Sequence, residues 1–153
     1  MATKQYWLLK SEPEAYSIDM LKRDKREPWT GVRNYQARNF MMQMRAGDEC
    51  IFYHTGEEKQ AVGLAKVVGK PYPDPTQFDR KSHYFDAKAT REKPIWMLVD
   101  ASFTKKFKRP VTLAEVKHDP VLKNMMLARA TRLSVQPVEK KHFEYLLKLA
   151  SAK

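Results

Sequence analysis

Residues 29–39 read WTGVRNYQARN and crowd aromatic rings, side-chain amides and guanidinium groups into one short segment. Trp29 and Tyr35 can stack on a planar ring, and an amide such as that of Asn34 can donate and accept hydrogen bonds at the edge of a base. Apolar side chains then recur at helical spacing, at Ala37, Phe40, Met41 and Met44. We therefore expect a loop that enters a helix, with Asn34 as the helix N-cap. The same groups also suit an ordinary polar loop.

The charge of the whole chain favours an anionic partner. Lys and Arg number 29 against 18 Asp and Glu, which gives a formal net charge of +11 and a pI of about 9.7. Such a balance makes nucleic-acid binding a reasonable first hypothesis. The chain is also 42% hydrophobic and 11% aromatic, which is enough for a real core. We expect one monomeric domain over residues 1–153.

The sequence offers little for metal, cofactor or redox chemistry. Cys50 is the only cysteine, so neither an internal disulfide nor a cysteine zinc site is expected. The histidines are far apart in the sequence, at His54, His83, His118 and His142. The 5 glycines do not cluster into a phosphate-binding loop. We predict no metal and no cofactor.

A catalytic function is also not favoured. Ser11, His54 and Asp48 could be drawn as a triad, but no nucleophile elbow surrounds the serine. No secretion signal and no long apolar segment is present, so we expect no membrane partner. The predicted location is cytoplasmic, or nuclear if the source is eukaryotic.

Short strands separated by turns and accompanied by helices predict the α+β class, with a small barrel or strongly curved sheet. Strands are expected at residues 5–10, 49–55, 60–68, 84–89, 95–103 and 133–135. Helices are expected after the caps Ser17 and Thr112, after Asp119, and from Pro137 to the C-terminus. Gly63 is expected to form a bulge, and residues 71–75 an ordered turn.

Two basic clusters are candidate phosphate contacts. The first is interleaved with Phe103 and Phe107 and consists of Lys105, Lys106, Lys108 and Arg109. The second cluster consists of Arg129 and Arg132. Arg33, in the segment 29–39, is a further candidate. For the first cluster, a solvated charged surface is an equally good explanation, because that is the commoner fate of charge runs. Phosphate contacts would give affinity without reading the base sequence. Arg129 and Arg132 gain weight because they precede residues 133–137, whose small and amide side chains could reach a base.

Five strings together resemble one family. They are YWLLKSEP at 6–13, WTGVRNYQARN at 29–39, FYHT at 52–55, PDPTQFD at 73–79 and RLSVQPV at 132–138. In this order, and over about residues 6–149, the chain is similar to the EVE domain family of the PUA-like superfamily. Thr55 stands where many relatives have Ser.

The resemblance implies a PUA-like β-pseudobarrel with flanking helices and a pocket similar to that of YTH domains. It further implies a non-catalytic module that recognises a modified base in DNA or RNA, with a modified cytosine in DNA expected first. Carried over to this chain, the pocket consists of Ser11, Trp29, Val32, Asn34, Tyr35, His54, Ser134 and Gln136. His54, Ser134 and Gln136 could equally be structural groups.

A base inside such a pocket must leave its stack, so the ligand is a single strand or a flipped nucleotide. Stacking on Trp29 would compensate for part of the unstacking energy. Two alternatives remain open: an enzyme or accessory subunit that acts on modified nucleic acid, and a small-molecule or nucleotide sensor that uses the same pocket. An enzyme needs an ionisable group in the pocket, whereas the groups near Trp29 are mostly neutral.

Overall fold

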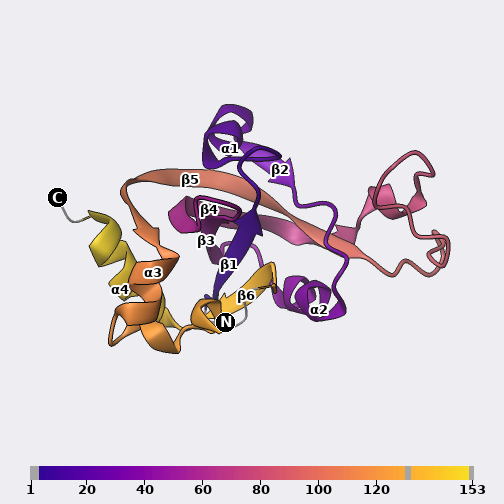
Figure 1. Cartoon of the computed structure of the whole chain (residues 1–153). Helices are drawn as coiled ribbons and strands as arrows, with labels where there is room; N and C mark the ends of the chain where they lie inside the picture. Colours follow the sequence, from indigo (N-terminus) through magenta and orange to yellow (C-terminus); the bar gives the residue numbers. More distant parts are fainter. Residues whose placement is uncertain (1–3, 130–131, 152–153) are drawn as a thin grey trace.

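The computed structural model contains one six-stranded mixed sheet with helices packed against it (Figure 1). It describes residues 4–129 and 132–151, so the ends of the predicted domain 1–153 lie outside the described residues. The strands are β1 (Tyr6–Ser11), β2 (Arg26–Pro28), β3 (Glu49–His54), β4 (Gln60–Pro73), β5 (Met97–Thr112) and β6 (Val135–Val138). The α-helices are α1 (Ile18–Asp24), α2 (Tyr35–Gln43), α3 (Leu113–His118) and α4 (Lys140–Ser151). The 3₁₀ turns are η1 (Pro75–Phe78), η2 (Leu122–Asn124) and η3 (Met126–Ala128).

The strand order is β2-β5-β4-β3-β1-β6. Only β1 and β3 pair in parallel among the described strands, and the other neighbours are antiparallel. The predicted α+β class is confirmed. Within the described residues β2 and β6 form the two edges, so the sheet is not closed into a barrel. No helix among the described residues is long and apolar enough to span a membrane.

Both faces of the sheet are buried, because side chains alternate along each strand. Along β1, Trp7 and Leu9 enter one core cluster, whereas Leu8 enters the other. The first cluster includes buried residues of α1 and α2 and contains Trp29. The second cluster includes residues of α3 and α4. The C-terminal end of β1 therefore lies between two differently packed faces.

The predicted helix caps are confirmed. Ser17 Oγ accepts a hydrogen bond from the Met20 amide at 3.1 Å, and Asn34 Oδ1 accepts one from the Ala37 amide at 2.9 Å. Thr112 forms a capping box with Glu115 at the start of α3. These short polar side chains satisfy amides at helix starts that have no partner within the helix.

The predicted bulge at Gly63 is also confirmed. The register of the β4·β5 ladder shifts between Ala61 and Gly63. A Cβ atom on Gly63 would lie 2.4 Å from the carbonyl oxygen of Lys105. Only glycine allows the two backbones to approach this closely.

Several expected elements are wrong. Residues 84–89 form turns rather than a strand, and residues 71–73 belong to β4 instead of a turn. The helix expected after Asp119 is divided into η2 and η3, because Met125 between them is extended (φ −63°, ψ 148°). The last strand lies at Val135–Val138, so α4 begins after it, at Lys140. Strand β5 continues nine residues beyond the predicted end at residue 103, to Thr112.

Candidate nucleic-acid interface

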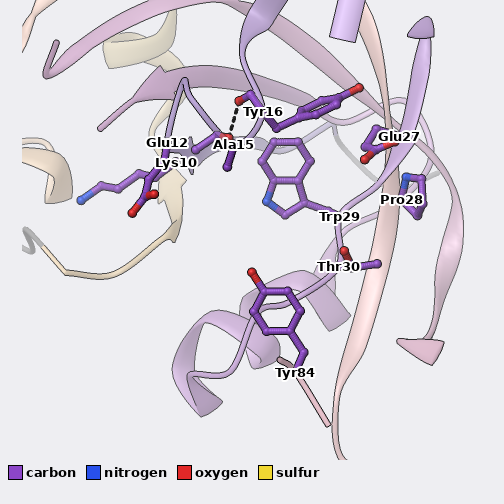
Figure 2. A pocket seen from close by; sticks show the side chains of 10 residues that line it. Lys10, Glu12, Ala15, Tyr16, Glu27, Pro28, Trp29, Thr30 and Tyr84 are labelled. Carbon is purple, nitrogen blue, oxygen red and sulfur yellow. Dashed lines mark hydrogen bonds between the residues drawn. The ribbon is translucent and has the colours of Figure 1, made fainter. Parts of the chain in front are cut away.

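A cavity of about 440 Å³ opens beside the C-terminal end of β1 (Figure 2). Its walls come from the turn after β1, from β2 and the loop behind it, and from the segment between β4 and β5. The lining residues are Lys10, Ser11, Glu12, Ala15, Tyr16, Glu27, Pro28, Trp29, Thr30 and Tyr84. Of the eight predicted pocket residues, only Ser11 and Trp29 line it.

Trp29 belongs both to the core and to this cavity. Its amide donates to the carbonyl of Val99 at 2.9 Å, which fixes the residue beside β5. The indole packs edge-on against Phe52, with ring centroids 5.5 Å apart, and against Tyr16 at 6.3 Å. Only 8% of the residue is exposed. The core therefore holds the ring rigidly, and one part of it faces the cavity.

Hydrogen bonds from Ser11 and Tyr16 fix the turn after β1. Ser11 Oγ donates to the Tyr16 carbonyl at 2.5 Å, and the Tyr16 hydroxyl donates to Asp24 Oδ2 at 3.0 Å. Burial, followed by the hydrogen bond to Asp24, raises the pKa of Tyr16 above its ordinary value. Tyr16 thus stays protonated and presents an aromatic face to the cavity.

Tyr84 supplies another aromatic wall (Figure 2). It is 44% exposed and lies against Gly31, where an added Cβ atom would be 2.6 Å from the tyrosine ring. Gly31 also has φ +86°, a conformation that side chains other than glycine rarely adopt. The sequence interpretation missed Tyr84 because it placed the residue in a strand. An aromatic pair, Tyr84 and Phe85, in a polar segment was the signal for an exposed binding loop.

Arg33 connects the loop at residues 29–33 to the segment around Tyr84, between β4 and β5. Its Nη2 donates to the Tyr84 carbonyl at 2.7 Å and to Thr76 Oγ1 at 3.0 Å. The guanidinium carbon lies 5.4 Å from the Tyr84 ring centroid and 5.3 Å from that of Trp96. The predicted phosphate contact of Arg33 remains a prediction, but these interactions occupy much of its donor fork.

Asp74 also holds the loop at residues 29–33, because it accepts hydrogen bonds from two residues of that loop. Its Oδ2 accepts hydrogen bonds from the Gly31 amide at 2.8 Å and from Arg33 Nη1 at 3.1 Å. Its Oδ1 accepts from the amide and the hydroxyl of Thr76 at 2.8 and 2.6 Å. Burial alone would raise the pKa of Asp74, but the bonds from Thr76, Gly31 and Arg33 outweigh it and hold the pKa below its ordinary value. The carboxylate is therefore a fixed anionic centre of the loop.

Two carboxylates, Glu12 and Glu27, also line the cavity together with Lys10, so the expectation of mostly neutral groups near Trp29 is wrong. Burial, followed by repulsion from Asp24, raises the pKa of Glu27. A glutamate oxygen can accept a hydrogen bond from the exocyclic amino group of cytosine. The cavity thus combines aromatic surface with acceptors for a base edge.

Three other predicted pocket residues, all in the segment 29–39, do not line the cavity. Val32 is 7% exposed and packs in the core. Asn34 caps α2. Tyr35 is 56% exposed and stacks on Trp96 at a centroid distance of 4.8 Å. Each of these side chains is therefore engaged in contacts away from the residues that line the cavity.

His54, Ser134 and Gln136 also lie outside the cavity walls. His54 is 5% exposed; its Nε2 accepts from the Ile18 amide at 3.1 Å, and its Nδ1 lies 2.9 Å from Glu58 Oε1. Gln136 Nε2 donates to the Leu133 carbonyl at 2.9 Å. The Ser134 carbonyl accepts from the Lys10 amide and so holds the end of β1. Each of the three residues is thus bonded within the fold, and its part in base binding remains a prediction.

The predicted phosphate contacts lie on different segments of the structure. Lys105, Lys106 and Lys108 are exposed on β5, where Lys106 Nζ lies 3.0 Å from Asp19 Oδ1. Arg109 forms an ion pair with Glu115. Arg129 and Arg132 are exposed on either side of residues 130–131. No group of three or more potential metal ligands occurs in the part of the chain that the structure describes.

Comparison with known proteins places these features in a family context. The EVE domain model matches residues 5–149. The chain is 40% identical to human thymocyte nuclear protein 1 over 164 residues, which cover 94% of this chain and 73% of that protein. A structure of human THYN1 in complex with DNA containing 5-methylcytosine matches with a TM-score of 0.92 and 38% identity, covering 98% and 99% of the two chains.

A hypothetical protein from Leishmania major matches with a TM-score of 0.93 and 46% identity, over 97% of this chain and 95% of that chain. A protein from Pseudomonas syringae matches with a TM-score of 0.90 and 45% identity, over 95% and 99%. The family model and the relatives span nearly the whole chain and agree with the resemblance of its five strings. The chain belongs to the EVE domain family.

Proposed function

We propose that this protein is a non-catalytic reader of a modified base, with a modified cytosine in DNA as its ligand. The observation that carries the proposal is the cavity in which Trp29, Tyr16 and Tyr84 supply aromatic surface next to the carboxylates Glu12 and Glu27. Its volume of about 440 Å³ falls in the range of about 300–1,000 Å³ that is typical of small-ligand sites.

The THYN1 complex supports the choice of ligand, because that relative was crystallised with DNA containing 5-methylcytosine and shares the fold of nearly the whole chain. The net charge of +11 supports a nucleic-acid partner independently. A base that enters the cavity would leave its duplex stack, at a cost of a few kcal/mol. Stacking on aromatic side chains returns about 1–3 kcal/mol per base.

The hydrogen bonds of Ser11 and His54 support recognition without reaction, because these two residues are the candidate nucleophile and base. Ser11 and His54 are paired in the β1·β3 register. Ser11 Oγ nevertheless donates to the Tyr16 carbonyl, and His54 Nε2 accepts from the Ile18 amide. A histidine nitrogen that accepts from a backbone amide is not free to deprotonate a serine.

A titration panel tests the proposal. Oligonucleotides of one sequence carry cytosine, 5-methylcytosine or 5-hydroxymethylcytosine at a single position, as single and double strands of DNA and RNA. Fluorescence anisotropy should show tighter binding of a modified DNA strand than of the plain strand. Equal affinity for modified and plain strands would refute the proposal that the protein recognises the modification. Mass spectrometry after incubation would reveal any chemical change to the base.

Tyr84→Ala is the variant of choice, because Tyr84 is 44% exposed and lines the cavity. We expect the preference for the modified base to fall while the melting temperature changes little. Phe85→Ala is the matched control: Phe85 is 38% exposed in the same segment but does not line the cavity. Loss of preference in both variants alike would contradict the assignment of Tyr84.

A further inference from the structure

A second cavity, of about 250 Å³, shares the residue Lys10 with the first. Its lining residues are Lys10, Tyr53, Thr55, Gly56, Lys59, Leu113, Lys117 and Leu127. Three of these are lysines, and none is an aspartate or glutamate. The first cavity, in contrast, has two carboxylates in its wall. The two neighbouring cavities therefore differ in the sign of their charge.

The three lysines come from separate elements. Lys10 lies in β1, Lys59 lies in the turn between β3 and β4, and Lys117 lies in α3. Their separation in the sequence means that only folding brings them around one cavity. An anion bound in the cavity would be attracted by all three ammonium groups. Partial burial lowers the pKa of Lys10 from its ordinary value.

The backbone holds Lys59 in a conformation that is uncommon for residues other than glycine. Its φ is +46°, and its carbonyl accepts a hydrogen bond from the Leu113 amide at 2.8 Å. This bond attaches the β3–β4 turn to the start of α3, which carries Lys117. The positions of the two lysine backbones are thus coupled. Strained backbone held by surrounding contacts is concentrated at functional sites.

The two cavities lie at the same strand end. Lys10 pairs with Tyr53, and Ser11 pairs with His54, in the β1·β3 register. Consecutive strand residues project to opposite faces of a sheet. Ser11 lines the first cavity only, whereas Lys10 Nζ lies 5.8 Å from the Tyr53 ring centroid in the second. Figure 2 shows the Lys10 side chain extending away from Trp29.

We propose that this second cavity binds a backbone phosphate of the same nucleic-acid strand whose base occupies the first. The inference rests on the proposed function, because the phosphate is taken from the strand whose base occupies the first cavity. Lys10, Lys59 and Lys117 supply the positive charge. Burial raises the pKa of Tyr53 to about 12, so its hydroxyl keeps its proton and can donate to a phosphate oxygen. Leu113 and Leu127 provide an apolar wall that suits the carbon atoms of a sugar.

The test uses the double variant Lys59→Gln/Lys117→Gln and a single-stranded oligonucleotide with one 5-methylcytosine. Dissociation constants are measured over a series of salt concentrations. For one lost phosphate contact, the slope of log affinity against log salt should become shallower by about 0.7. The ratio of affinities for modified and plain oligonucleotides should stay constant, because a phosphate contact does not read the base.

Lys66→Gln/Lys70→Gln is the matched control, because it removes the same charge from exposed positions on β4 that line neither cavity. Its slope should remain close to that of the wild type. Equal slopes for the two double variants would overturn the phosphate site. Melting temperatures of both variants verify that they are folded.

Two further ligands distinguish failure of this site from failure of the proposed function. The nucleoside 5-methyl-2′-deoxycytidine lacks a phosphate, so its binding should be unaffected by Lys59→Gln/Lys117→Gln. A wild-type protein that shows no preference for the modified oligonucleotide would refute the base reader. The slopes for the plain oligonucleotide would still decide the phosphate site, because that comparison needs no modified base.

Discussion

Arg33 and Tyr84, 51 residues apart in the sequence, are joined by two hydrogen bonds and a stacking contact. Arg33 Nε and Nη2 donate to the Tyr84 carbonyl at 3.0 and 2.7 Å, and the guanidinium carbon lies 5.4 Å from the tyrosine ring centroid. The contact connects the loop after β2 to the segment between β4 and β5. Both segments contribute walls to the candidate base cavity.

Arg33→Lys tests whether this contact positions Tyr84 or whether Arg33 binds phosphate. Lysine keeps the charge but loses the planar fork that reaches the Tyr84 carbonyl. We expect the preference for the modified base to fall, with an unchanged salt slope. If Arg33→Lys binds like the wild type while Arg33→Gln makes the slope shallower, Arg33 is a phosphate contact instead.

Trp29→Ala should destabilise the fold as well as the cavity. Trp29 is 8% exposed and packs against Phe52 and Tyr16, so we expect a loss of about 3–5 kcal/mol in unfolding free energy. Urea denaturation measures this loss. Trp29→Phe keeps an aromatic ring and should cost less, which allows binding to be measured on a folded protein. A Trp29→Ala protein of wild-type stability would show that the indole is not part of the core.

Asp74→Asn should weaken the fold at neutral pH and reduce its sensitivity to acid. The pKa of Asp74 lies below its ordinary value of 3.8, so its carboxylate contributes stability above that pH and loses it as the pH falls further. We expect a cost of about 3 kcal/mol at pH 7, since the Arg33 charge loses its partner. The difference from the wild type should shrink as the pH falls below 3.8 toward the lower pKa of the folded protein. A difference that stays constant below pH 3.8 in thermal melts would contradict this role.

Gly63→Ala should destabilise the sheet by about 1–3 kcal/mol through overpacking. The added Cβ atom would lie 2.4 Å from the Lys105 carbonyl oxygen and 2.9 Å from the Ile18 side chain. Adding Ile18→Val to Gly63→Ala should recover little, because the closer contact is with the backbone. Full recovery in the double variant would identify the Ile18 side chain as the cause.

Local patterns in the sequence were sufficient for the helix starts, the main strands and the class of the fold. The caps Ser17, Asn34 and Thr112 act on amides three residues further along the chain, so their effect can be recognised without the tertiary structure. The family strings also depend only on order and composition, and they identified the EVE domain family correctly. Residues 84–89 were misassigned because hydrogen bonds donated by the side chains of Arg33 and Trp96, and not a strand ladder, hold that segment.

The sequence by itself determined that this chain is a basic α+β protein, because charge, apolar periodicity and local capping are properties of neighbouring residues. The resemblance of its five strings identified the EVE family. Only the tertiary structure decided which polar and aromatic groups face the cavity. Asn34, His54 and Gln136 have the chemistry of a binding site but are bonded to the backbone of their own surroundings. Tyr84 lines the first cavity and Lys117 lines the second, and contacts between distant segments of the chain bring each residue there. Such contacts depend on how the packed core orients each segment, which no local pattern records.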